Sequence, residues 1–164
     1  MTMKRILKHL LTTRAAVTRA FPVSALNEIE AAIKASESEH AGEIRFVVEA
    51  ALDGAPLFRG QSPADRAIEV FARLRVWDTE HNNGLLIYLL LADRAVEIVA
   101  DRGIHAKVAA GAWRQVCLQM EAAFTRSDYE AGVVAGVQAV TQHLARHFPA
   151  DTRANELPDR PVLL

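Results

Sequence analysis

The sequence predicts one α/β domain: a three-layer sandwich with a small mixed β-sheet and helices on both faces of that sheet. Segments of helical and strand periodicity follow the order helix, strand, helix, strand, strand, helix, helix. A hydrophobic fraction of 51% in 164 residues is enough for one core, because a chain of this length buries roughly 70% of its surface on folding. Two of the strand segments are separated only by a tight turn, which indicates a hairpin.

The chain divides into three parts: an amphipathic helix with its connection (residues 1–21), the α/β domain (22–148) and an extended polar tail with several prolines (149–164). In the first part, apolar and basic side chains segregate to two faces of a helix over residues 3–11. The apolar ones are Met3, Ile6, Leu7, Leu10 and Leu11, and the basic ones are Lys4, Arg5 and Lys8. We expect this helix to dock and pack on the domain. Contact with a partner or a membrane surface is the alternative.

The first half of the domain is expected to contain a helix, a strand and a second helix. Ser24 is expected to cap the first helix, and Gly42 to end it in a left-handed conformation. Residues 43–50 alternate in the manner of a strand. Residues 53–61 contain two glycines and a proline, which predict a loop. The pair Ser62–Pro63 is a strong start signal for the next helix.

Two more strands are expected in the second half. Residues 85–92 are almost wholly apolar, which is typical of a central strand that is covered on both faces. A turn at residues 92–94 leads to a strand at 95–101, and the short connection requires an antiparallel pair. A right-handed crossover makes the strand at 43–50 parallel to the one at 85–92.

Helical periodicity closes the domain. It extends over residues 104–125, with a break near Gly111, and again over residues 128–147. Gly132 and Gly136 lie on one face of the last helix. Their spacing predicts that a neighbouring element approaches this helix closely.

Composition excludes several classes of function. The formal net charge of −1 lacks the basic excess of a nucleic-acid binder. The longest apolar run, residues 85–92, is too short for a transmembrane span, and charged residues interrupt the N-terminal segment, so we expect no signal peptide. Cys117 is the single cysteine, so no intrachain disulfide can form and a reducing compartment is the simplest setting. Because we expect neither an export signal nor a membrane span, we expect a cytoplasmic location. We interpret Cys117 as a buried apolar side chain rather than a nucleophile.

The candidate site is the polar loop at residues 77–84, which precedes the central strand. We expect this loop to meet the end of the strand at 95–101 and the start of the strand at 43–50. Clustered carboxylate and amide oxygens are suitable ligands for Ca²⁺ or Mg²⁺. The candidate ligands are Asp78, Glu80, Asn82, Asn83 and Asp101, and Glu43, Arg102 and His105 are expected to support them. The alternative is that the asparagines form a turn and that the acids are solvated.

Other catalytic patterns are incomplete in this sequence. It contains no glycine-rich phosphate loop, no Gly-x-Ser-x-Gly motif and no His-Glu-x-x-His motif. His143 and His147 lie one helical turn apart, but a zinc site needs a third ligand. We therefore interpret these two histidines as part of a helix surface.

Several segments resemble the TPM domain family over about residues 24–147. They are Trp77 with Asn83–Ile87, the Ala-Asp-Arg turn at 92–94, the stretch 97–103, and the helix that carries Tyr129, Gly132 and Gly136. The resemblance implies a three-layer α/β sandwich and polar-site positions at Asp78, Asn83 and Asp101. It also implies that some members bind divalent cations, that plant members have acid phosphatase activity, and that others act in the repair or assembly of membrane complexes. The segment 19–22 departs from the usual entry to the first helix, so metal ligation there is not carried over.

The function that we expect is that of a TPM-type accessory or interaction domain, open to modulation by Ca²⁺ or Mg²⁺. It would act on membrane-associated or assembly partners through contact with an unidentified protein. The alternative is a metal-assisted, acid phosphatase-like hydrolase that uses Asp78 and Asp101.

Overall fold

A four-stranded sheet lies at the centre of the computed structural model, which describes residues 2–152 and 154–164. The strands are β1 (Glu43–Glu49), β2 (Gly84–Leu90), β3 (Ala95–Ala100) and β4 (Val162–Leu163), in the order β3-β2-β1-β4. β1 is parallel to β2 and β4, and β2 is antiparallel to β3. The predicted crossover and hairpin are therefore confirmed. The fourth strand, formed by the end of the tail, was not predicted.

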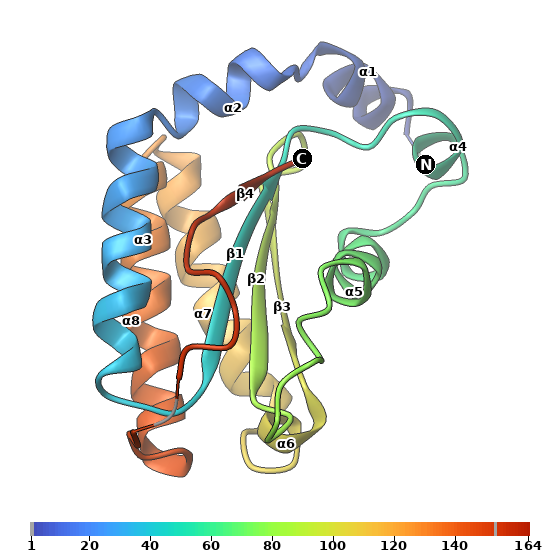
Figure 1. Cartoon of the computed structure of the whole chain (residues 1–164). Helices are drawn as coiled ribbons and strands as arrows, with labels where there is room; N and C mark the ends of the chain where they lie inside the picture. Colours follow the sequence, from blue (N-terminus) through green and yellow to red (C-terminus); the bar gives the residue numbers. More distant parts are fainter. Residues whose placement is uncertain (1, 153) are drawn as a thin grey trace.

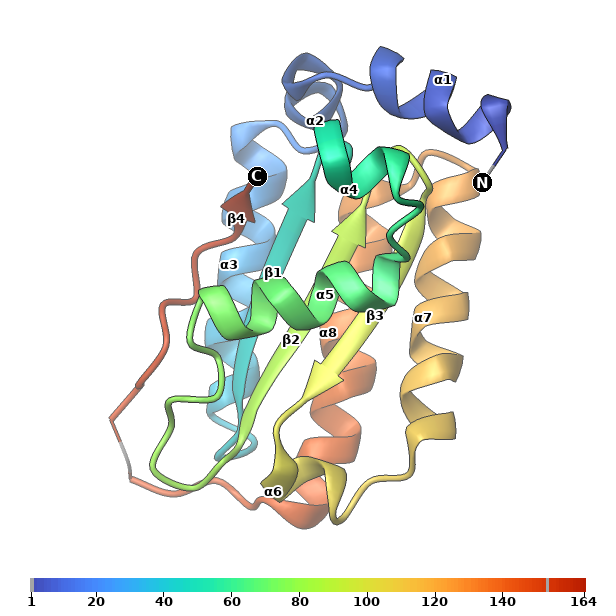
Figure 2. The same ribbon diagram turned by 90° about the vertical axis from the view of Figure 1, so that its right-hand side faces the viewer.

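Helices cover both faces of the sheet, which confirms the predicted three-layer sandwich (Figures 1 and 2). The helices are α1 (Met3–Leu11), α2 (Arg14–Ala20), α3 (Val23–Glu37), α4 (Gly54–Phe58), α5 (Pro63–Arg73), α6 (Arg102–His105), α7 (Ala110–Thr125) and α8 (Tyr129–His147). Helices α3, α7 and α8 pack on one face and α5 packs on the other. Among the described residues, no helix is both long and apolar enough to span a bilayer.

The central strand is buried on both sides because its side chains alternate between two apolar cores. Leu85, Ile87 and Leu89 face the core under α3, α7 and α8. Leu86 and Tyr88, with Leu90, face the smaller core under α5. This arrangement explains why the strand has almost no polar residue in its sequence.

Two details of α3, the first helix of the predicted α/β domain, were predicted wrongly. Helix α3 already begins at Val23 after Pro22 and has no side-chain cap, so Ser24 lies within its first turn. The helix ends at Glu37, and Gly42 does not adopt a positive φ. Gly42 instead permits close packing, because a Cβ there would lie 2.8 Å from a methyl group of Leu144.

Three further elements differ from the expectation. The predicted loop at 53–61 contains α4, which forms because Leu57 is fully buried. Helix α2 lies in the segment that was interpreted as a connection. The helical region 104–125 breaks at residues 106–109 rather than at Gly111, since Asp101 caps a separate short helix, α6.

Other predictions hold. The Ser62 hydroxyl accepts a hydrogen bond from the Asp65 N–H and caps α5. A Cβ at Gly132 would lie 2.8 Å from the ring of Phe124, and one at Gly136 would lie 2.4 Å from the sulfur of Met120. The two glycines therefore allow α7 and α8 to pack closely.

The two ends of the sheet carry different segments. Helices α1 and α2 cross the end at which β1 and β2 finish (Figures 1 and 2). The loop before β2, helix α6 and the chain that leaves α8 gather at the opposite end.

Candidate functional site

The predicted meeting of the polar loop with the end of β3 is confirmed. The Asp101 N–H donates to the Gly84 carbonyl at 2.9 Å. The Gly103 N–H donates to the Asn82 carbonyl at 3.0 Å, and Arg102 Nε donates to Asn82 Oδ1 at 3.0 Å. Strand pairing causes this contact, because β3 runs back along β2 and returns the chain to the loop at which β2 began.

Asn83 and Asp101 are buried where the polar loop meets the end of β3. The Asn83 side-chain amide donates to the Ala41 carbonyl, and its backbone N–H donates to Thr79 Oγ1. One carboxylate oxygen of Asp101 accepts from the Arg102 N–H at 2.7 Å. Asn83 Oδ1 and Asp101 Oδ2 have no hydrogen-bond partner among the described residues. These two buried oxygens therefore have an unused capacity to accept a hydrogen bond or bind a cation.

The remaining predicted ligands point elsewhere. Asp78 is half exposed and pairs with Arg75 at 2.6 Å, and Glu80 is exposed. His105 lines a separate surface pocket beside Trp113. The parts of the chain that are described contain no group of three or more His, Cys, Asp or Glu placed to hold a metal.

These residues fit a cation only in part. Asn83 and Asp101 supply two free oxygens and one negative charge, whereas Ca²⁺ takes about six to eight oxygen ligands. Main-chain oxygens and water would have to provide the others. The Ca²⁺ or Mg²⁺ site stays a prediction.

Glu43 binds the tail rather than the polar loop. Its carboxylate accepts hydrogen bonds from the N–H groups of Glu156 (3.3 Å) and Leu157 (3.1 Å). Burial raises the pKa of Glu43. Burial and, next, the neighbouring Asp159 carboxyl raise the pKa of Glu37 to about 8. Glu43 therefore holds the tail against β1, and Glu37 on α3 keeps its proton beside Asp159 of the tail.

We expect the Glu37→Gln variant to change how stability depends on pH. Folded Glu37 keeps its proton up to about pH 8, whereas the unfolded chain releases it near its ordinary pKa of 4.5. The folded state therefore binds more protons in this window, so this group makes stability fall as pH rises from about 5 to about 8. Thermal unfolding across this range should show a smaller decline for the variant, and a higher midpoint than wild type near pH 8.

Glu28→Gln is the matched control, since Glu28 is an exposed glutamate on the same helix. Its pH profile should follow that of the wild type. Parallel profiles for wild type and Glu37→Gln would contradict the assignment.

His40 is buried and does not respond in the same range. Its Nδ1 accepts from the Gly42 N–H at 3.1 Å. Burial lowers the pKa of His40 to about 4, so the ring is neutral near physiological pH.

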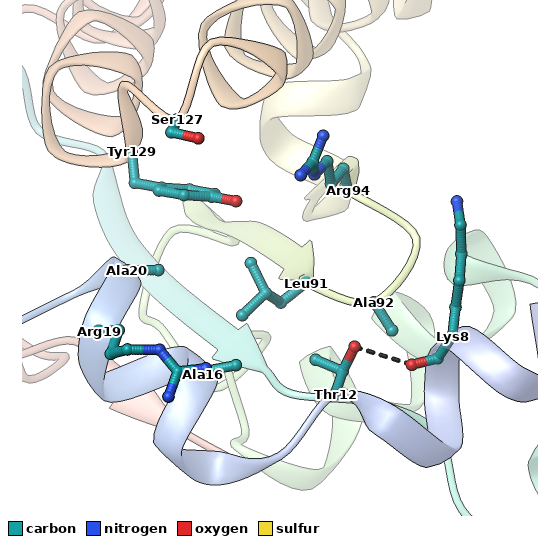
Figure 3. Close-up of a pocket in the computed structure, with 10 residues that line it drawn as sticks. All are labelled: Lys8, Thr12, Ala16, Arg19, Ala20, Leu91, Ala92, Arg94, Ser127 and Tyr129. Atoms are coloured by element: carbon teal, nitrogen blue, oxygen red, sulfur yellow. Dashed lines mark hydrogen bonds between the residues drawn. The ribbon is translucent and has the colours of Figure 1, made fainter.

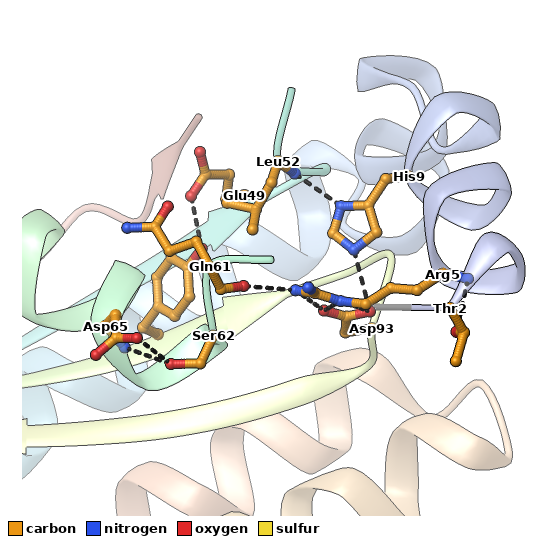
Figure 4. A network of polar contacts seen from close by, with 10 residues as sticks. Thr2, Arg5, His9, Glu49, Leu52, Gln61, Ser62, Asp65 and Asp93 are labelled. Carbon is orange, nitrogen blue, oxygen red and sulfur yellow. Dashed lines mark hydrogen bonds and ion pairs between the residues drawn. The ribbon is translucent and has the colours of Figure 1, made fainter. Parts of the chain in front are cut away.

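A second polar cluster, at the other end of the sheet, fixes α1 to the domain (Figure 4). Arg5 Nη2 lies 2.8 Å from the Asp93 carboxylate and 2.9 Å from the Gln61 carbonyl oxygen. His9 is buried, with its Nε2 3.0 Å from Asp93 Oδ1, and its Nδ1 accepts from the Leu52 N–H at 2.9 Å. The helix is thus attached by its polar side chains.

The helix therefore docks on the domain as expected, but its apolar stripe faces solvent. The exposed fractions are 80% for Met3, 56% for Leu7, 63% for Leu10 and 71% for Leu11. Ile6 alone among the apolar residues of the stripe is partly buried. The contacts of Arg5 and His9 with Asp93, which sequence periodicity does not reveal, decide which face docks.

A family model of the TPM domain matches residues 18–143. The chain belongs to the TPM domain family. The match begins near the end of α2 and includes strands β1 to β3, helix α3 and most of α8. Helix α1 lies before the matched region.

Two solved structures resemble this TPM domain protein. The NMR structure of BA42 from the psychrophilic bacterium Bizionia argentinensis is 27% identical, with a TM-score of 0.76, over 88% of this chain and 95% of BA42. The N-terminal domain of a protein from P. gingivalis is 25% identical, with a TM-score of 0.58, over 76% of each chain. A comparison with curated proteins gives no match.

Sequence reasoning missed two polar groups of this TPM domain. One is the attachment of α1 through Arg5, His9 and Asp93. The other is a buried network in which Glu49 accepts from Arg66 and from the Tyr88 hydroxyl. The available signal for the second was Glu49, which directly follows the apolar run at residues 46–48 of β1, since a buried carboxylate requires partners.

Proposed function

We propose that this TPM domain protein is a non-catalytic accessory domain that works at a membrane surface, with α1 as its interfacial anchor. The observation that carries the proposal is the orientation of α1. Arg5 and His9 attach the helix to the domain, while its leucines face solvent. A helix held in this way presents a ready apolar surface without any rearrangement of the core.

The charge of the N-terminal segment favours an anionic lipid surface over a protein as the binding partner of the apolar face of α1. Residues 2–27 contain five Lys or Arg and no Asp or Glu. Lys4 and Lys8 are exposed beside the apolar stripe. Basic residues that border an apolar helix face are typical of helices that lie in the membrane interface. Each such charge contributes about 1 kcal/mol near an anionic bilayer.

Sedimentation with vesicles tests the proposal. Vesicles of phosphatidylglycerol and phosphatidylcholine should bind the wild-type protein, and vesicles of phosphatidylcholine alone should bind it more weakly. The Leu7→Glu/Leu10→Glu variant should bind at least about tenfold more weakly, since two buried leucines contribute roughly 1.5–3 kcal/mol each. Both leucines are exposed, so the variant should fold normally, which circular dichroism can verify.

Leu118→Glu is the matched control. Leu118 is 42% exposed on α7, outside the proposed contact. This variant should sediment like the wild type. Failure of the wild type to bind anionic vesicles would contradict the proposal, and so would equal binding of the double variant. If that same leucine pair were instead required for binding a purified protein, the lipid surface would be replaced by a protein partner.

The phosphatase alternative receives less support from the geometry. It requires Asp78 and Asp101 to act together. Asp78 instead pairs with Arg75, and Asp101 caps α6 through the Arg102 N–H. Turnover of p-nitrophenyl phosphate with Ca²⁺ or Mg²⁺, lost in Asp101→Ala, would reverse this preference.

Cation modulation of the accessory domain is proposed at Asn83 and Asp101, on the basis of their two unpartnered oxygens. We expect millimolar Ca²⁺ or Mg²⁺ to raise the melting temperature of the wild type, because a ligand that binds only the folded state stabilises it. Asp101→Asn keeps an oxygen for the α6 cap but removes the charge, so its melting temperature should respond less. Identical responses of the two proteins would exclude this site.

A further inference from the structure

An open pocket of about 610 Å³ lies beneath α1 and α2, where the N-terminal helices meet the β2–β3 turn and the α7–α8 turn (Figure 3). It lies at the end of the sheet where the parallel strands β1 and β2 finish, which is where ligands bind in open α/β sheets. Its volume is within the range of small-molecule sites, about 300–1,000 Å³.

Three cations from three different elements line this pocket. Lys8 comes from α1, Arg19 from α2 and Arg94 from the β2–β3 turn. None of the three has an ion pair among the described residues, and no acidic side chain lines the pocket. Three positive charges that line one pocket repel each other, and a bound anion reduces that repulsion.

Two acidic side chains that are adjacent in sequence to lining residues are engaged elsewhere. Asp93 precedes Arg94 but accepts from Arg5 and lies against His9. Asp128 pairs with Arg126 at 3.3 Å. Neither of these two acids therefore forms an ion pair with a cation of the pocket.

Hydroxyl groups complete the lining. Thr12, Ser127 and Tyr129 border the pocket, and the Tyr129 hydroxyl points into it in Figure 3. The ring of Tyr129 is fixed, because it stacks on Phe124 with ring centres 5.4 Å apart and packs against Phe21 at 5.6 Å. A hydroxyl on a fixed ring can orient an oxyanion at little cost in side-chain entropy.

Two of the lining residues occupy strained backbone positions. Arg94 has φ of 52° and Ser127 has φ of 64°, both in turns where glycine would be free of strain. Such positions are enriched at binding sites. Here they direct an arginine and a serine to the same pocket.

We propose that this pocket binds a phosphate group. Arginine and lysine with hydroxyl donors are the usual protein partners of phosphate oxygens, and arginine binds them in a bidentate manner. The group can come from a soluble phosphate ester or from a phospholipid headgroup beside the exposed face of α1. The proposal does not require membrane attachment, because the cations belong to the pocket whether or not α1 contacts lipid.

NMR titration of the full chain with inorganic phosphate tests the site, with chloride at equal ionic strength as reference. Saturable shifts are expected at the amides of Ala92–Arg94 and Ser127–Tyr129. Arg94→Gln should weaken binding at least about tenfold, because a bidentate contact is lost. Arg94→Gly should weaken it similarly while relieving backbone strain, so a folding defect cannot explain the loss.

Arg73→Gln is the charge-matched control, since Arg73 is exposed on α5 away from the pocket. It should leave phosphate binding unchanged. The proposal is overturned if phosphate and chloride produce the same shifts, or if Arg94→Gln and Arg73→Gln bind phosphate equally.

Two further titrations distinguish the two possible sources of the phosphate group. Glycerol 3-phosphate represents a soluble ester, and monomeric dihexanoyl phosphatidylglycerol represents a lipid headgroup. Tighter binding of one than the other assigns the source, and either result supports the pocket. The Leu7→Glu/Leu10→Glu variant should retain phosphate binding, so failure of vesicle attachment and failure of this site are distinguishable.

Discussion

A Gly84→Ala variant is expected to lose most of the stability of the domain. The added Cβ would lie 1.9 Å from the Val76 carbonyl oxygen and 3.0 Å from the Val76 carbonyl carbon. Both positions are backbone, so no side-chain rotation can relieve the overlap. Gly84 also begins the central strand, which β1 and β3 hold on either side. The loss in unfolding free energy should exceed about 4 kcal/mol, the range of exceptional single substitutions.

Gly111→Ala is the control for this prediction, because a Cβ at Gly111 meets nothing within 4 Å. In the first turn of α7, alanine should be neutral or stabilising by up to about 1 kcal/mol. Urea unfolding of both variants measures the difference. Similar unfolding midpoints for Gly84→Ala and wild type would contradict the packing of Val76 against the start of β2.

The Glu49→Gln variant is expected to show the second-largest loss of unfolding free energy. The Glu49 carboxylate is buried and accepts from Arg66 Nε at 2.9 Å, from Arg66 Nη2 at 2.7 Å and from the Tyr88 hydroxyl at 2.6 Å. Burial raises the pKa of the Tyr88 hydroxyl, so that group remains a donor at all ordinary pH values. Removing the negative charge leaves the Arg66 guanidinium without its buried counter-ion, which typically costs about 3–5 kcal/mol.

Glu69→Gln provides a control on the same guanidinium. Glu69 pairs with Arg66 at 3.0 Å, but its side chain is 56% exposed. Exposed ion pairs contribute about 0–1 kcal/mol, so this variant should unfold close to the wild type. Equal losses for the two variants would show that burial of Glu49 does not determine the strength of the pair.

Local patterns predict the sheet of this TPM domain well. The crossover and the hairpin follow from the alternation in β1, the apolar run of β2 and the short turn that leads to β3. The tail strand β4 could not be predicted, because Val162 and Leu163 form only two residues of strand. They pair with β1 across more than a hundred residues of sequence.

The orientation of α1 could not be predicted from the sequence either, because it depends on contacts between residues that are distant in sequence. An amphipathic pattern marks two faces but does not say which of them docks. The decision comes from partners of His9 that are distant in sequence, the Leu52 N–H and the Asp93 carboxylate.

The candidate site was predictable only where strand pairing controls it. Asn83 and Asp101 come together because β2 and β3 form a hairpin, whereas Asp78 and Glu80 lie on a loop that no pairing constrains. The phosphate pocket combines Lys8, Arg19 and Arg94 from separate segments. Arg94 of this pocket has a φ that favours glycine, and a single sequence does not reveal this strained conformation.

The most direct test of the account is the environment of the apolar face of α1 when anionic vesicles are added. An environment-sensitive fluorophore can be attached at Leu10→Cys or, as control, at Leu118→Cys. Cys117 is buried and its pKa is raised to about 12, so it should not react. We predict a blue shift and a gain in fluorescence at position 10 with phosphatidylglycerol vesicles, and neither at position 118. Unchanged fluorescence at position 10, or equal changes at both positions, would contradict the proposal that α1 inserts its leucines into the membrane surface.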